Sequence, residues 1–171
     1  MKSRNIVLSG LFIALGVLLP IVFHQFNMGG PVFLPMHIPV LMAGLLLGPI
    51  EGLLVGVITP IISSLLTGMP PLFPMLPIMI AELGTYGLTS GYFSKKLKVN
   101  TYISLIAGMI DGRIAAGIMV FILANFFGFN SGPLLYLKGA IMTGLPGIII
   151  QLLFIPPIVR LLKRDKVTFY S

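Results

Sequence analysis

The sequence predicts an all-α integral membrane protein with six transmembrane helices and both termini in the cytoplasm. Of its 171 residues, 57% are hydrophobic and only 9% are charged, and the mean hydropathy is +1.07. Soluble domains contain roughly 25% charged residues, so this chain is suited to a lipid bilayer. About six spans of roughly 20 residues with short connections account for its length. We therefore expect a single transmembrane domain over residues 1–171 and no separate soluble domain.

Six apolar runs support this count of helices. A loop, rather than a small-x-small cleavage site, follows the first run, which predicts an uncleaved helix instead of a signal peptide. The second run has 12 residues, too few to cross a core of about 30 Å unless neighbouring residues extend it, so a re-entrant or broken segment remains an alternative. The runs cover residues 6–23, 37–48, 51–66, 74–93, 102–127 and 134–162.

The basic residues predict the orientation. Nine of the eleven lysines and arginines fall on one side of the six predicted spans, and the positive-inside rule makes that side the cytoplasm. Both termini lie on this side, which agrees with an even number of spans. The net charge of +7 therefore reflects topology, and we expect no nucleic-acid partner. The nine residues are Lys2, Arg4, Lys95, Lys96, Lys98, Arg160, Lys163, Arg164 and Lys166.

Three charged residues lie deep inside predicted spans, away from the span ends, where each costs roughly 2.5–3.5 kcal/mol on insertion scales. Counting from the span ends at 1.5 Å per residue places Glu82 about 9 Å and Arg113 about 13 Å below the outer edge of the core. We therefore expect an ion pair between them, across two helices. Asp111 is two residues from Arg113 and points to nearly the opposite side, so it faces another neighbour or a wet cavity.

Other polar residues indicate a pocket open to the outside. Glu82, Thr85, Tyr86 and Thr89 recur at helical spacing and form one polar face. Such a face, with further polar groups toward the outer side, favours a site for a small polar solute. The alternative is that Glu82 and Arg113 form a purely structural pair. The candidate solute-binding residues are Glu82, Tyr86, Arg113, Asn125, Lys138, Asp111, Gln151 and Asn27.

The sequence lacks the motifs for ATP binding, for serine-hydrolase catalysis and for metal binding. The chain has no G-x-x-x-x-G-K-[ST] loop for ATP, so the energy for transport must come from elsewhere. It has no G-x-S-x-G motif, and His24 and His37 show no metal-ligand spacing. We expect neither an enzyme nor a bound metal or cofactor.

Four segments together resemble a known family: "MHIPVLMAGLLLGPIEGLLVG", "SLLTGMPPLFPMLPIMIAELGTYGLTSG", "GMIDGRIAAGI" and "LKGAIMTGLPGIIIQLL". The chain is similar over nearly its whole length to the substrate-binding S components of energy-coupling factor (ECF) transporters, which import vitamins into bacteria. The resemblance implies a multi-pass protein of the bacterial plasma membrane. It further implies a vitamin site near the outer surface and docking on a transmembrane coupling protein with two ATPase subunits.

The resemblance also assigns roles to residues. Docking in the family uses an Ala-x-x-x-Ala pattern on the first helix; Gly10 and Ala14 occupy these positions, and glycine keeps the close approach possible. Arg113 and Lys138 would suit a carboxylate or phosphate, Glu82 a hydroxyl or amine, and Tyr86 would stack or hydrogen bond. Asn125 is the fifth residue expected to contact the vitamin. A pantothenate-like vitamin fits it best, and pyridoxine-like and folate-like ligands also fit.

Two other functions remain as alternatives. A self-contained, proton-coupled secondary transporter would use Glu82 or Asp111 as its proton site. A membrane scaffold would only assemble partners and would bind no small molecule.

Overall fold

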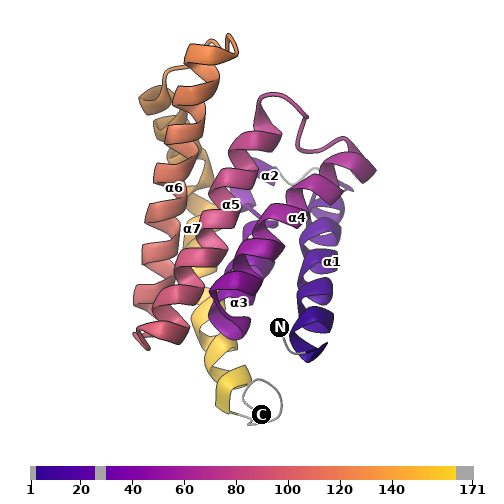
Figure 1. The fold of residues 1–171 in the computed structure, drawn as a ribbon, viewed down its shortest axis with the longest axis vertical. Helices are drawn as coiled ribbons and strands as arrows, with labels where there is room; N and C mark the ends of the chain where they lie inside the picture. Colours follow the sequence, from indigo (N-terminus) through magenta and orange to yellow (C-terminus); the bar gives the residue numbers. More distant parts are fainter. Residues whose placement is uncertain (1–2, 26–29, 165–171) are drawn as a thin grey trace.

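The computed structural model describes residues 3–25 and 30–164, and these residues form helices and turns but no strands. All six predicted apolar runs are helical, and Figure 1 shows them as one bundle. A short helix precedes the second run, and a π-helical turn follows the fourth. The elements are α1 (Ser3–Gln25), α2 (Gly30–Phe33), α3 (His37–Leu47), α4 (Pro49–Thr67), α5 (Met75–Gly91), η1 (Tyr92–Lys96), α6 (Thr101–Phe126) and α7 (Pro133–Arg164).

Four of these helices, α1, α4, α6 and α7, are long and apolar enough to cross a membrane. α5 has 17 residues and continues into the five residues of η1. α3 has only 11 residues, or about 16 Å at 1.5 Å per residue, which is roughly half of a bilayer core. The length and composition of the helices therefore support four spans directly.

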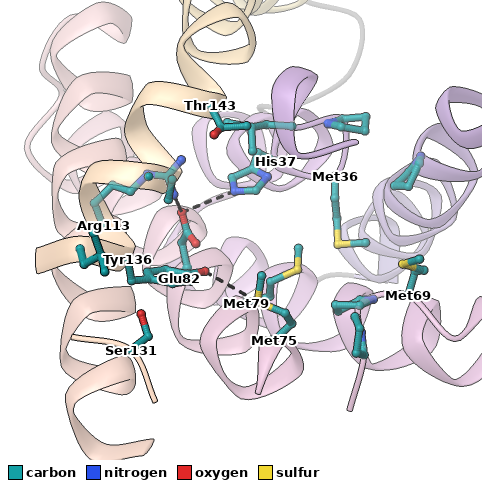
Figure 2. A pocket seen from close by; sticks show the side chains of 18 residues that line it. Met36, His37, Met69, Met75, Met79, Glu82, Arg113, Ser131, Tyr136 and Thr143 are labelled. Carbon is teal, nitrogen blue, oxygen red and sulfur yellow. Dashed lines mark hydrogen bonds and ion pairs between the residues drawn. The ribbon is translucent and has the colours of Figure 1, made fainter. Parts of the chain in front are cut away.

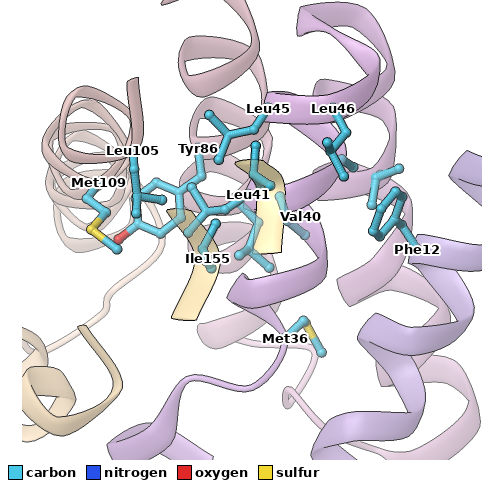
Figure 3. Close-up of a cluster of buried hydrophobic side chains, with 14 residues drawn as sticks. Phe12, Met36, Val40, Leu41, Leu45, Leu46, Tyr86, Leu105, Met109 and Ile155 are labelled. Atoms are coloured by element: carbon cyan, nitrogen blue, oxygen red, sulfur yellow. The ribbon is translucent and has the colours of Figure 1, made fainter. Parts of the chain in front are cut away.

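The short helix α3 lies in the middle of the bundle. Val40, Leu41 and Leu45 are completely buried, and Figure 3 shows them among side chains of α1, α5, α6 and α7. Tyr86 of α5 packs into the same cluster. Because α3 is surrounded by protein, its polar ends need not face lipid, and a helix shorter than the bilayer is tolerated at this position.

A sharp turn joins α3 to α4. Gly48 has φ +135°, a conformation that favours glycine, and Pro49 follows as the first residue of α4, where a missing N–H costs nothing. The sequence Gly-Pro therefore ends one helix and begins the next without a loop.

Glycines bring α4 and α5 into backbone contact. A Cβ atom on Gly87 would collide with the carbonyl group of Gly52, and one on Gly56 would collide with the backbone of Leu83. Gly44 of α3 likewise faces Gly87. These close contacts fix the position of α5, which carries Glu82, relative to α3 and α4.

α1 lies at one edge of the bundle in Figure 1, and α6 and α7 lie at the opposite edge. Asn5 donates a hydrogen bond of 2.9 Å to Glu51 Oε1, which joins the first turns of α1 and α4. Higher up, Gly16 packs directly on Thr59 of α4. α1 begins and α7 ends at the same end of the bundle (Figure 1).

Candidate functional site

A cavity of about 570 Å³ opens between α1, α3, α5, α6, α7 and the segment that joins α4 to α5. Its volume lies within the range of roughly 300–1,000 Å³ that is usual for small-molecule sites. Figure 2 shows that the charged side chains gather on one wall and the methionines on another. The cavity is therefore polar at one end and apolar over most of its surface.

The charged wall is built by three helices. Arg113 of α6 forms an ion pair with Glu82 of α5, with 2.8 Å between Nη1 and Oε1. Tyr86 donates a hydrogen bond of 3.1 Å to the same oxygen, and His37 Nε2 of α3 lies 3.6 Å from it. The side chain of Glu82 is only 4% exposed and that of Arg113 only 12%. The ion pair expected from counting along the helices is confirmed.

Four nitrogens of this wall have no hydrogen-bond partner among the described residues: Nε and Nη2 of Arg113, and Nδ1 and Nε2 of His37. All four are buried. Burying a donor without an acceptor is unfavourable, typically by about 1–3 kcal/mol. On Arg113 alone, the wall therefore offers two nitrogen donors that the described residues do not satisfy.

Methionines form the apolar wall. Met36 directly precedes α3, Met69 comes from the segment after α4, and Met75 and Met79 come from α5. Tyr136 of α7 donates a weak hydrogen bond to Met75 Sδ at 3.9 Å. Unbranched, polarizable methionine side chains adapt to the shape of an apolar or aromatic group.

Small residues give the charged wall its geometry. A Cβ atom on Gly112 would collide with the ring of Tyr86, so this glycine of α6 leaves the space in which Tyr86 lies beside Glu82. At Gly144 of α7 the tight neighbour is Leu34, because a Cβ there would lie 3.0 Å from Leu34 Cδ1. Glycine therefore sets the spacing between α5 and α6 beside the charged groups.

Two of the predicted residues line the cavity, and two others support it. Glu82 and Arg113 are lining residues. Tyr86 is 2% exposed and is not a lining residue, but it supports two lining residues, through its hydrogen bond to Glu82 and its ring contact with His37. Gln151 is buried and donates a hydrogen bond of 3.4 Å to the carbonyl oxygen of Leu34. Leu34 has φ +51° and lines the cavity, so Gln151 holds a strained turn of the wall in place.

The other predicted residues lie away from the lining. Asn125 is exposed and donates to the carbonyl oxygen of Phe121 on its own helix, at 2.8 Å. Lys138 is exposed on α7, next to the lining residue Gly139. Asp111 is half-buried on α6 and is not a lining residue. Asn27 lies outside the described residues. Solute contact by these four residues stays a prediction.

Sequence reasoning missed His37, the methionine wall and Tyr136. His37 is the first residue of α3, and its place at the head of an apolar run suggested no ligand. Four of the chain's ten methionines line the cavity, but they are spread over three segments and share no spacing. Only the packing of α3 against α5 brings these side chains together.

A helical bundle with four helices able to cross a membrane, enclosing a cavity with a buried ion pair, defines a polytopic membrane protein. A family model described as the ECF transporter, substrate-specific component, matches residues 4–159. The chain belongs to this family, as the resemblance of its four segments implied. Its members are transporter components rather than an enzyme class, and they partner with membrane coupling and ATPase modules. No curated protein and no solved structure matches the chain significantly.

Proposed function

We propose that the chain is the high-affinity binding subunit for uptake of a water-soluble vitamin across the bacterial plasma membrane. It captures the vitamin from the outside in the cavity between α3, α5, α6 and α7. It then docks on a transmembrane coupling protein driven by two ATPase subunits and passes the vitamin inward. The observation that carries this proposal is the buried Arg113–Glu82 pair beside a cavity of about 570 Å³.

The solute that we favour is pantothenate-like, with pyridoxine-like and folate-like vitamins as the other candidates. Arg113 has donors without a partner among the described residues, and a guanidinium group suits a carboxylate. The apolar walls suit the remainder of a compact molecule. Glu82 already accepts from Arg113 and Tyr86 through one oxygen, so its main role is to hold Arg113.

In the membrane, we propose that α1, α3, α4, α5, α6 and α7 form six crossings with both termini cytoplasmic, in one S-component domain. The support is that α1 begins and α7 ends at the same end of the bundle. Lys163 near the end of α7 also donates a hydrogen bond of 3.0 Å to Ser94 of η1, so the basic ends of α7 and η1 lie together. The short α3 is shielded by its neighbours, and α5 is lengthened by η1.

We propose docking through the outer face of α1. Gly10 and Ala14 are exposed, and a Cβ on Gly10 would meet no atom within 4 Å. The same face exposes Val7, Leu11 and Leu18. A smooth apolar face with small residues allows the backbone of a partner helix to approach closely.

The test is a thermal-shift screen of the detergent-solubilised chain against a panel of vitamins. We expect one vitamin to raise the melting temperature, and Arg113→Ala to abolish that rise. Arg160→Ala is the matched control, because Arg160 is an exposed arginine that stacks on Tyr102, 5.2 Å from the ring centre. An undiminished shift in Arg113→Ala would remove Arg113 from the site.

Uptake assays decide between the proposed subunit and a self-contained carrier. Vesicles that contain the chain together with its coupling module should accumulate the vitamin only with ATP. Accumulation by the chain alone, driven by a proton gradient, would establish the carrier instead.

A further inference from the structure

The net charge of the cavity wall limits what can bind there. Glu82 and Arg113 cancel one another in a close pair that is nearly inaccessible to water. An acidic solute at Arg113 would add one uncompensated negative charge to this desolvated place. Burying such a charge is strongly unfavourable unless a cation accompanies it.

His37 is the group that can supply this cation. Its Nε2 lies 3.6 Å from Glu82 Oε1, and its ring packs edge-on against Tyr86 with 5.3 Å between centres. Imidazole is the side chain that ordinarily gains a proton between pH 5 and 8. When protonated, it has two N–H groups, one for Glu82 and one for a second anion.

We propose that His37 is a solute-binding residue that takes up a proton when an acidic solute enters the cavity, so that each bound anion is accompanied by one proton. The proton comes from solvent and binds to the imidazole; no covalent bond of the solute changes. This inference rests on the proposed function, because it concerns the same cavity. Beyond the proposed function, it specifies that the solute is an acid, that His37 recognises it together with Arg113, and that binding depends on pH.

The donor count agrees with this proposal. Nε and Nη2 of Arg113 and both ring nitrogens of His37 have no hydrogen-bond partner among the described residues. The acid supplies acceptors for the Arg113 donors and for the N–H of His37 that does not face Glu82. These nitrogens are covered in the present arrangement. The acid therefore reaches them when the guanidinium and imidazole groups turn toward the cavity, which both side chains line.

The other titratable groups of this cavity wall come from three helices. Among the described residues, those that line the cavity or contact His37 are Glu82 and Tyr86 on α5, Arg113 on α6 and Tyr136 on α7. α1 contributes only Pro20 to the cavity. Tyrosines ordinarily stay neutral at physiological pH, whereas imidazole is the kind of side chain that gains a proton there, and His37 carries the imidazole of this wall.

The test uses pairs of compounds that differ only in the acid: pantothenate and panthenol, biotin and biotinamide, lipoate and lipoamide. Binding to the purified full-length chain is measured by calorimetry from pH 6.5 to 8.5, where all three acids are ionised. We expect the acid of one pair to bind and its neutral partner to bind at least about tenfold more weakly. On the alkaline side of the imidazole titration, its Kd should rise about tenfold per pH unit, as uptake of one proton requires.

His37→Gln keeps a hydrogen-bonding side chain but cannot take up the proton. We expect this variant to melt like the wild type, to bind the acid at least about tenfold more weakly at pH 6.5 and to lose the pH dependence. His24→Gln, which removes the chain's other histidine, is the matched control and should keep it. Buffers with different ionisation enthalpies should give different binding heats for the wild type and equal heats for His37→Gln.

Three results would overturn the inference: equal binding of an acid and its neutral partner, a pH dependence that persists in His37→Gln, or no binding by any acid. These results do not decide the proposed function. ATP-driven uptake of a neutral vitamin with the coupling module would leave that function standing and refute only the role of His37.

Discussion

Replacing Arg113 by methionine, alone and together with a replacement of Glu82, separates the contribution of the ion pair to stability from its contribution to vitamin binding. The change keeps an unbranched apolar side chain but removes the guanidinium group. The Glu82 carboxylate, which is 4% exposed, then keeps only the hydrogen bond from the Tyr86 hydroxyl and the His37 ring nitrogen at 3.6 Å. Breaking a buried pair from one side typically costs about 3–5 kcal/mol, because a charge is left without its partner. We expect Arg113→Met to lose stability in this range.

The double variant Glu82→Gln/Arg113→Met should recover most of this loss. Replacing both members of a buried pair by uncharged groups is often neutral, or stabilising by about 1–4 kcal/mol. Unfolding is followed by far-UV circular dichroism during titration with SDS, since the chain contains no tryptophan for fluorescence. The double variant should therefore fold like the wild type and fail to bind the vitamin that the screen identifies.

Two results would refute this reasoning. A loss below about 1 kcal/mol in Arg113→Met would mean that the pair is not desolvated as its burial indicates. Wild-type affinity in the double variant would mean that the pair serves the fold alone.

The remaining predictions concern packing, the cavity wall and docking. Gly87→Ala should lower the free energy of unfolding by about 1–3 kcal/mol in SDS titration, because its Cβ would meet immobile backbone of α4. The control Gly10→Ala should change this free energy by less than about 0.5 kcal/mol. Equal effects of the two substitutions would contradict the close helix contact. Gln151→Leu should weaken vitamin binding about tenfold by releasing Leu34, measured by calorimetry, and unchanged affinity would remove it from a positioning role. Ala14→Leu should leave the thermal shift intact and abolish ATP-driven uptake, and normal uptake would place docking elsewhere.

The sequence was sufficient to predict the features that depend on helix length, on hydropathy and on the depth of a residue in the membrane. Hydropathy located all six helices because each apolar run is bounded by glycine, proline or charge. Counting at 1.5 Å per residue was enough to pair Glu82 with Arg113, since two antiparallel helices in a bilayer of fixed thickness leave little freedom in depth.

Features that depend on helix rotation were not predictable. Thr85 was expected on the polar face of the pocket, but its hydroxyl donates to the carbonyl oxygen of Ala81 on its own helix. Tyr86 turns toward α6 because Gly112 leaves space for its ring. In a membrane helix both the lipid-facing and the core-facing sides are apolar, so the residue pattern gives little information on which side faces which neighbour. The same ambiguity concealed His37.

One helix carries both a wall of the cavity and the face that we assign to docking. Pro20 of α1 lines the cavity, while Gly10 and Ala14 lie exposed further along the same helix. A partner that binds α1 from outside the bundle therefore also contacts the helix that forms one side of the solute cavity. Solute binding and docking would then depend on the same helix, and any displacement of α1 by the partner would also change the shape of the solute cavity.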